Sequence, residues 1–404
     1  MKRHFIIILA LGAYCIADAQ NWVEYKPHPQ EQRINSVFFF DSNKGYTVGD
    51  GGTILNTLNG GITWNAQNSG TLKTLNSIFF TNPTTGFICG GGWIYTTGCL
   101  LKTTNAGLTW NTVSMGNIDP IYSSCFPVQD TGFIVGLFGS IYKTTNSGEL
   151  WQDHRVDSIN FLRSVHFPSA GIGYTIGVAA GSLGGTILKT SDCGLTWNHL
   201  TWTTNQLFSV FFINNNIGIT VGESGTILKT NDGGVTWNLQ TSDLIYPYYL
   251  YSVFFSTSAI GYAVGECGTI LKSIDGGTTW NSQNSGTGKN LYSVYFIDSK
   301  TGFAVGDDGL ILSTKNGGDR INERELSKFM KIYPEPANDQ VFIELSGLEP
   351  KGSLILLTMN GQEVIRTQIS RQKTQLDIGQ LEKGIYFVMF QNDQILQLGK
   401  LLKD

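Results

Sequence analysis

The sequence predicts an all-β protein, a seven-bladed β-propeller followed by a small C-terminal β-sandwich. The same order of motifs occurs seven times between Ile34 and Gly318, and the closing tryptophans lie 40 to 46 residues apart. A repeat of this length that contains only strands is typical of propeller blades. The seventh copy lacks its closing Thr-Trp, whereas Trp22 precedes the first copy. We therefore expect the N-terminal segment to supply the last strand and close the ring.

Each repeat divides into four short strands. In the first copy, Ser36–Phe39 is almost continuously apolar, which predicts an innermost strand covered on both faces. The second strand is expected at Gly45–Gly49 and the third at Gly52–Leu55. The fourth and outermost strand begins at Thr63-Trp64-Asn65.

A fixed turn joins the third strand to the fourth in every copy. It carries Asn or Asp at its start and Gly at its end, so the side chain can accept backbone N–H bonds while Gly adopts a positive φ. Because the same residues recur in every blade, we expect a structural role and not a catalytic or metal-binding one. The turns are Asn59–Gly61, Asn105–Gly107, Asn146–Gly148, Asp192–Gly194, Asp232–Gly234, Asp275–Gly277 and Asn316–Gly318.

These motifs resemble two known repeats. Asp-x-Gly-x-Thr-Trp at Asp192–Trp197 resembles the Asp-box (BNR) repeat. The longer frame Val221–Trp237 is similar to the propeller family of photosystem II assembly and stability factors. The resemblance covers roughly residues 22–318 and implies the propeller fold. It implies no particular activity, because Asp boxes recur on propellers with unrelated functions.

After the charged segment 319–328, which we interpret as a linker, the repeat ends and a second domain begins at residue 329. Short alternating strands are expected at Gln340–Leu345, Gly352–Thr358, Val364–Ile369 and Gly384–Phe390. Asn360-Gly361 predicts a hairpin turn between two of them. This pattern predicts a β-sandwich over residues 329–404.

Ordered motifs in this domain resemble the type A sorting domain of the type IX (Por) secretion system. They include Ile332–Ala337, Leu376–Ile378, Leu381–Tyr386 and Gly399–Lys403, and they depart from the family at Glu335, where Asn is usual. The resemblance implies that the type IX machinery recognises this tail at the outer membrane of a Gram-negative bacterium. The tail would be removed, and the propeller would remain on the cell surface or be released.

Residues 1–19 have the pattern of a signal peptide. A basic start at Lys2–His4 precedes the apolar stretch Phe5–Ile16, and Ala17–Ala19 is a small-x-small cleavage site. The stretch is too short to span a bilayer, which takes roughly 20 residues. We therefore expect residues 20–318 to be exported as the propeller.

Composition excludes several functions. The formal net charge is −4 and no basic run occurs, so the sequence predicts no nucleic-acid partner. Five cysteines follow the signal segment at spacings that match no metal motif, and we expect no metal or cofactor. We expect these cysteines to be buried or turn thiols, and Cys89 and Cys99, which flank an insertion, are the only pair suited to a disulfide.

Glycan hydrolysis is the enzymatic alternative, because it needs two facing carboxylates. A sialidase would also need several arginines, and the repeats contain only Arg155 and Arg163. His166 stands where other blades place an aromatic residue and is expected to lie in the core. Four acids follow Val-Gly in consecutive blades and either form an acidic arc or simply suit the turn. They are Asp50, Glu223, Glu266 and Asp307.

Aromatic residues in the loops offer a binding site instead. Trp93 and Tyr95 lie in an insertion of blade 2, Trp202 is expected between blades 4 and 5, and Tyr246 and Tyr248 lie between blades 5 and 6. These loops open on one face, where the rings either bind a ligand or pack on their own blades. We predict a non-enzymatic binding or scaffolding module for a protein or polysaccharide. A glycan hydrolase and an assembly factor for a protein complex are the alternatives.

Overall fold

The computed structural model describes residues 22–25, 31–92, 97–157, 159–179, 184–319, 330–346, 350–358, 362–392 and 396–404. The expected signal peptide, residues 1–19, lies outside these ranges. The chain separates into two compact units, Asn21–Gly318 and a unit that contains Asp319–Asp404. Within the described ranges, no helix has the length and apolar character needed to cross a membrane.

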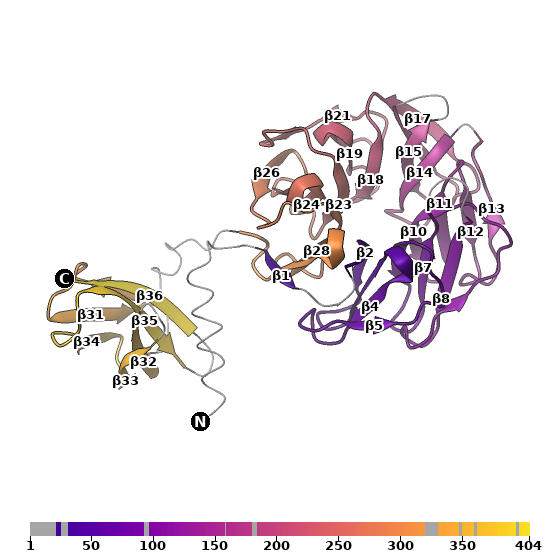
Figure 1. The fold of residues 1–404 in the computed structure, drawn as a ribbon. Helices are drawn as coiled ribbons and strands as arrows, with labels where there is room; N and C mark the ends of the chain where they lie inside the picture. The colour runs from indigo at the N-terminus through magenta and orange to yellow at the C-terminus, as the bar shows by residue number, and fades with distance from the viewer. Residues whose placement is uncertain are drawn as a thin grey trace. The chain divides into compact units, whose positions relative to one another are not determined.

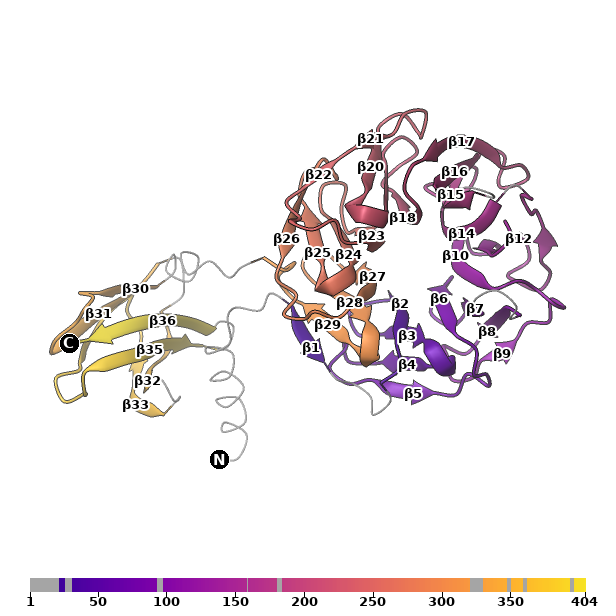
Figure 2. The same ribbon diagram turned by 45° about the horizontal axis from the view of Figure 1, so that its top comes forward.

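The first unit is a ring of seven antiparallel sheets arranged around a common axis (Figures 1 and 2). In blade 1 the strands run outward in the order β2 (Ile34–Phe39), β3 (Gly45–Gly49), β4 (Ile54–Thr57) and β5 (Asn65–Gln67). In the second half of β2, Val37 and Phe39 are buried and Phe38 between them is half-buried, as expected for side chains on opposite faces of a strand. The predicted order of strands in a blade is confirmed.

The remaining blades repeat this order. Blade 2 contains β6 (Leu75–Phe80), β7 (Gly86–Gly90), β8 (Cys99–Thr103) and β9 (Asn111–Thr112); blade 3 contains β10 (Ile121–Val128), β11 (Thr131–Gly136), β12 (Ile141–Thr144) and β13 (Gln152–Asp153). Blade 4 contains β14 (Ile159–His166), β15 (Gly173–Ala179), β16 (Gly185–Thr190) and β17 (Asn198–Thr203); blade 5 contains β18 (Leu207–Phe212), β19 (Gly218–Gly222), β20 (Ile227–Thr230) and β21 (Asn238–Leu239). Blade 6 contains β23 (Leu250–Phe255), β24 (Gly261–Gly265), β25 (Ile270–Ser273) and β26 (Thr279–Gln283), with β22 (Thr241–Ser242) added outside β26. Blade 7 contains β27 (Leu291–Phe296), β28 (Gly302–Gly306), β29 (Ile311–Thr314) and, from the N-terminus, β1 (Val23–Tyr25).

The N-terminal segment closes the ring, as predicted. β1 pairs antiparallel with β29 of blade 7. Trp22 is fully buried, and its indole Nε1–H donates to Gln283 Oε1 at 3.1 Å. The indole also packs edge-on against Phe296 and Tyr262. The first and last parts of the propeller sequence therefore share one blade.

A ring of serines ties the innermost strands together. In six links, the serine Oγ of one blade accepts a backbone N–H bond from the next blade, at 3.1 to 3.4 Å. In the seventh link, Ser77 Oγ meets Ser124 Oγ at 3.0 Å. The Ser-Val motif of the repeat thus provides one bond across each blade junction. The seven serines are Ser36, Ser77, Ser123, Ser164, Ser209, Ser252 and Ser293.

The Asx turns have the structural role expected from their repetition. The Asp232 carboxylate accepts bonds from the Thr236 backbone N–H at 2.9 Å, the Thr236 hydroxyl at 2.6 Å and the Thr230 hydroxyl at 2.8 Å. In blade 1, Asn59 accepts the corresponding bonds from the Thr63 N–H and the Thr57 hydroxyl. The tryptophan that follows packs between blades, since Trp64 lies in one core with residues of blades 1 and 7.

The second unit has two sheets around a common core, as predicted for a sandwich. One contains β30 (Met330–Tyr333), β31 (Gln340–Leu345) and β34 (Lys373–Asp377) in that order. The other has the order β33 (Glu363–Ile369), β32 (Gly352–Thr358), β35 (Gly384–Gln391) and β36 (Leu396–Lys403). β32 and β33 form the expected antiparallel pair, although Asn360-Gly361 lies outside the described residues.

The one candidate disulfide, Cys89–Cys99, does not form. Cys89 and Cys99 are both free and buried. In the register of β7 and β8, Cys89 lies opposite Leu100 and Cys99 lies opposite Gly90. Side chains of successive residues in a strand point to opposite faces, so the two thiols lie on opposite faces of the sheet. The spacing of Cys89 and Cys99 in the sequence does not indicate on which face of the sheet each thiol lies.

Candidate functional site

One face of the propeller carries the start of each innermost strand, the turn after each second strand and the connections between blades. We call it the connection face. Four of its turns are short 3-10 helices, η1 (Asp50–Gly52), η2 (Glu223–Gly225), η3 (Glu266–Gly268) and η4 (Asp307–Gly309). Each begins with one of the four predicted acids, so their placement in this turn is confirmed.

The acids of blades 5 and 6 hold the start of the innermost strands. Glu223 accepts a bond from the Gln206 backbone N–H at 3.3 Å and one from the Tyr249 hydroxyl at 2.7 Å. Glu266 accepts from the Tyr249 backbone N–H at 3.0 Å and from the Tyr251 hydroxyl at 3.2 Å. Both oxygens of each carboxylate are therefore engaged by the protein itself.

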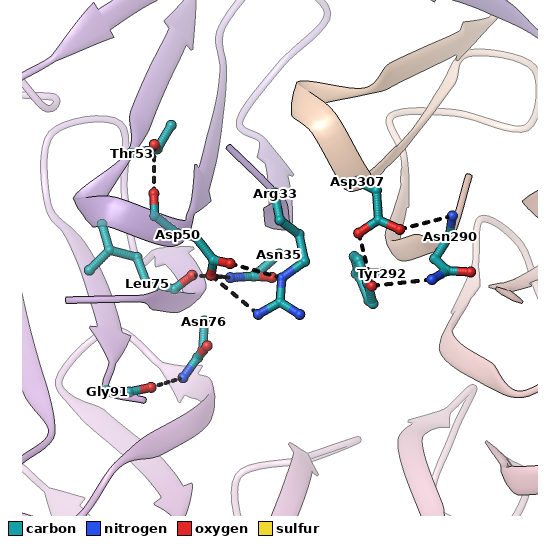
Figure 3. Close-up of polar contacts among 10 residues, drawn as sticks. All are labelled: Arg33, Asn35, Asp50, Thr53, Leu75, Asn76, Gly91, Asn290, Tyr292 and Asp307. Carbon is teal, nitrogen blue, oxygen red and sulfur yellow. Dashed lines mark hydrogen bonds and ion pairs between the residues drawn. The ribbon is translucent and has the colours of Figure 1, made fainter. Parts of the chain in front are cut away.

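Figure 3 shows the acids of blades 7 and 1, of which Asp307 has the same arrangement and Asp50 a different one. Asp307 accepts from the Asn290 backbone N–H at 3.3 Å and from the Tyr292 hydroxyl at 3.0 Å. Asp50 accepts from Asn35 Nδ2 at 3.1 Å and forms an ion pair with the Arg33 guanidinium at 3.2 Å. Arg33 lies between the two turns, 5.0 Å above the Tyr292 ring.

This geometry favours the structural interpretation of the acidic arc. Hydrolysis of a glycoside requires one carboxyl group to deliver a proton and the other to attack or to activate water. Here each carboxylate lies in the turn of its own blade and accepts bonds from the adjoining innermost strands. In the part of the chain that the structure describes, no group of three His, Cys, Asp or Glu residues is suited to hold a metal ion.

His166 lies in the core of the ring, as expected. Its Nδ1 accepts the Phe212 backbone N–H of the next blade at 3.3 Å, and its ring lies 4.6 Å from the Phe211 ring. Burial lowers the pKa of His166 to about 4, so the imidazole is neutral at pH 7. The histidine extends a row of aromatic rings formed by Phe211, Phe254 and Tyr295 of the next three blades.

The structure separates the predicted aromatic site into parts. Trp93 and Tyr95 lie outside the described residues. The prediction that Trp202 lies in the connection between blades 4 and 5 is wrong. Trp202 lies within β17, where it pairs with Thr186. Blade 4 has a longer outer strand than the repeat pattern indicated, because β17 extends to Thr203. The Trp202 side chain is 55% exposed, and its ring lies 3.7 Å from that of His199.

Tyr246 and Tyr248 lie in the connection between blades 5 and 6, as predicted. Their rings are 5.8 Å apart, and Tyr246 is 62% exposed. The preceding Ile245 is 88% exposed. The connection therefore presents an apolar surface to solvent beside the turns of blades 5 and 6.

The sequence did not predict a groove between the outer parts of blades 4 and 5. Its volume is about 370 Å³. Trp202, Thr203 and Asn205 line the side toward blade 4, and Leu228 and Trp237 line the side toward blade 5. The short segment between β17 and β18, residues 204–206, is the feature of the sequence that leaves this space open.

Comparison with known families identifies both units. The sequence matches the family model of the photosynthesis system II assembly factor YCF48 over residues 16–184, 190–284 and 245–315. The chain belongs to the YCF48 family. Residues 331–404 match the secretion system C-terminal sorting domain. This YCF48-family propeller is therefore a secreted or cell-surface protein.

Solved structures with the same fold include proteins of different function. YCF48 bound to D1 peptide is 23% identical over 74% of this chain and 97% of that one, with a TM-score of 0.59. PorZ, a surface component of the type-IX secretion system of Porphyromonas gingivalis, is 12% identical over 90% and 58%, with a TM-score of 0.55. The GH74 enzyme of Niastella koreensis is 14% identical over 80% and 59%, with a TM-score of 0.59. At these identities the likeness shows the fold alone. No curated protein matches the sequence significantly.

Proposed function

We propose that this YCF48-family propeller is a non-enzymatic binding module that holds a segment of a partner protein on its connection face. Trp202, Tyr246 and Tyr248 contact the partner, together with Trp93 and Tyr95. The observation that carries the proposal is the exposure of Tyr246 and of the neighbouring Ile245 in the connection between blades 5 and 6. Aromatic side chains contribute large contact areas and are enriched at the centres of protein interfaces.

Two further observations support a polypeptide ligand. The acids of the connection face are engaged by the protein's own N–H and O–H groups, which favours binding over hydrolysis. YCF48, a propeller of the same family, has been seen bound to D1 peptide. A related propeller that binds a peptide makes a peptide the preferred class of ligand for this chain.

Binding can be tested with the purified chain as bait for surface proteins of the source cells and, in parallel, on a glycan array. We expect capture of a protein partner. Replacing Tyr246 and Tyr248 together by Ala should weaken capture by about a hundredfold or more, since each buried aromatic ring contributes on the order of 1.5–3 kcal/mol. The control is Leu72→Ala, because Leu72 is an exposed apolar residue in another connection of this face.

Three outcomes would count against the proposal. Equal capture by the wild type and the Tyr246/Tyr248 variant would show that these two tyrosines are not part of the binding site. Retention of an intact glycan in place of a protein would change the ligand class to a polysaccharide. Shortened glycan products would establish the hydrolase and direct mutagenesis to Asp50, Glu223, Glu266 and Asp307.

The C-terminal unit supplies the route to the surface. We propose that the type IX machinery engages residues 329–404 and that the propeller then stays associated with the outer membrane. Deleting these residues should trap the propeller in the periplasm, which cell fractionation measures. Normal surface display of the truncated chain would contradict this role for the tail.

A further inference from the structure

Blade 6 differs from the other blades by a fifth strand. The connection from blade 5 contributes β22, which pairs in parallel with β26 so that Thr241 lies opposite Thr279 and Ser242 opposite Trp280. The Asp243 backbone N–H then donates to the Trp280 carbonyl at 3.2 Å. The outer edge of a blade in this protein can thus accept an extended segment.

The residues that follow β22 complete the attachment. The Asp243 carboxylate accepts bonds from the Ser282 backbone N–H at 2.7 Å and from its hydroxyl at 3.0 Å. Leu244 packs against the core between blades 5 and 6, which contains Leu271 and Trp280. Trp280 is consequently only 1% exposed. The segment supplies backbone bonds, one acceptor side chain and one aliphatic side chain.

Blade 5 has the same edge without the segment. Leu228 lies opposite Leu239 in β20 and β21, just as Leu271 lies opposite Ser282 in blade 6. By this register, the Leu239 N–H points away from β20 and toward the outer edge of the blade, in the same way as the Ser282 N–H. β21 is the last strand of its sheet. The chain cannot fill the edge from blade 4 as it does from blade 5, because residues 204–206 are too few to form a strand.

The groove between blades 4 and 5 borders the residues equivalent to those that Leu244 packs with in blade 6, and Leu200 of β17 packs with the same residues from the core. Leu228 and Trp237, the counterparts of Leu271 and Trp280, line the groove on one side, and Trp202 lines the other. Three apolar side chains around it are exposed: Trp202 by 55%, Val235 by 76% and Leu239 by 72%. Burying apolar surface of this kind is the main source of binding energy in peptide recognition.

We propose that an extended segment of a partner protein binds blade 5 as a fifth strand, parallel to β21. Its backbone pairs with Thr236 and Trp237, an Asp or Asn side chain accepts the Leu239 N–H, and the next, aliphatic residue enters the groove beneath Trp202. The recognised pattern is therefore small–small–acidic–aliphatic, as in Thr241–Leu244. This inference shares Trp202 and the class of ligand with the proposed function, and it uses the outer edge of blade 5 instead of Tyr246 and Tyr248.

The test uses a fluorescein-labelled peptide Gln-Thr-Ser-Asp-Leu-Ile, the sequence of residues 240–245. We expect saturable binding to the full chain by fluorescence anisotropy and slower hydrogen exchange of the amides of 236–240. A peptide with Ala in place of both Asp and Leu should bind at least about tenfold more weakly, because it lacks the acceptor and the apolar group. Absence of binding by the unmodified peptide at millimolar concentration would overturn the proposal.

Matched variants locate the bound peptide. Val235→Lys should weaken binding about tenfold or more, because Val235 is exposed at the groove. Leu195→Lys is the control, since Leu195 holds the same position in the turn of blade 4 and is also exposed. Equal binding to the wild type and Val235→Lys would show that the peptide binds elsewhere and would overturn the proposal. One such place is β26, where the peptide could displace β22, the segment of the chain with the same sequence.

The two proposals fail in different ways. Tyr246→Ala should leave binding of this peptide unchanged while it weakens capture of the partner on the connection face. Loss of peptide binding in Tyr246→Ala would show that the peptide and the partner share one site. It would contradict binding of the peptide in the groove between blades 4 and 5.

Discussion

At the scale of single residues, the repeats show which side chains are structural, because equivalent positions can be compared within one chain. The Asx turn carries Asp in blades 4 to 6 and Asn in the others, and the side-chain oxygen of either residue accepts the backbone N–H four residues on. The direction of the bond to the threonine hydroxyl differs, since Asn59 Nδ2 donates to Thr63 whereas the Thr196 hydroxyl donates to Asp192. The carboxylate, unlike the amide, can also be protonated.

This difference gives a prediction about pH. Hydrogen bonds to the carboxylate, first from the Thr196 hydroxyl and then from its N–H, lower the pKa of Asp192 to about 2; bonds from Thr236 lower that of Asp232 in the same way. A lowered folded-state pKa means that the stabilisation is present above about pH 4 and is lost as the pH falls to about 2. Asp192→Asn with Asp232→Asn should therefore show a smaller drop in Tm between pH 4 and pH 2 than the wild type.

The reciprocal change provides the control. Asn59→Asp in blade 1 should enlarge the drop in Tm over the same pH range, because Asn59 accepts the same bonds from Thr57 and Thr63. An equal drop in Tm between pH 4 and pH 2 in the wild type, the Asp192/Asp232 variant and Asn59→Asp would contradict the prediction. It would show that the charged form of these carboxylates is not preferentially stabilised in the folded state.

His166 gives a second prediction, in a different pH range. Since burial lowers its pKa from 6.5 to about 4, protonation favours the unfolded chain, and stability is lost as the pH falls from about 6.5 to about 4. His166→Phe introduces the residue that blade 5 has at this position, Phe211, and should flatten the unfolding free energy over this range. The wild-type loss at pH 4 is at most about 3 kcal/mol. Urea unfolding at pH 7 and pH 4.5 measures the change in unfolding free energy. An equal change in the wild type and in His166→Phe would contradict the lowered pKa of His166.

At the scale of elements, the sequence predicted what depends on repetition and local patterns. β3, β31 and β32 have the predicted bounds, because flanking glycines and alternating residues mark their ends. The fifth strand β22 was missed, since two residues that pair in parallel leave no periodic pattern. The partners of the acids were missed for a similar reason: Tyr249 bonds to Glu223 of the preceding blade, and that contact exists only after the ring has formed.

The bonds between innermost strands allow a test at this scale. Ser293 Oγ accepts the Val37 N–H across the junction of blades 7 and 1. Ser293→Ala leaves this amide without its acceptor and should lower the free energy of unfolding by about 1 kcal/mol. Denaturant unfolding measures the change. Ser209→Ala, which removes the equivalent bond to Val253, should cost a similar amount, and a loss in only one of the two would contradict an equal role for the links.

At the scale of the whole molecule, the propeller depends on two segments that lie almost 300 residues apart in the sequence. Trp22 is separated from Gln283 by 261 residues, yet it occupies the position that Thr-Trp holds in the other blades. The sequence predicted this closure because the seventh copy lacked its tryptophan. Stability should therefore depend on this residue more strongly than its place near the N-terminus suggests.

Trp22→Ala is expected to lower the free energy of unfolding by about 3–5 kcal/mol, because it removes a fully buried aromatic side chain and weakens the attachment of β1 to β29. Trp202→Ala is the matched control, since Trp202 is 55% exposed and its loss should cost far less. Urea unfolding monitored by circular dichroism compares the two variants. If Trp22→Ala unfolds at the same urea concentration as Trp202→Ala, blade 7 is stable without its N-terminal strand and the ring does not depend on this closure.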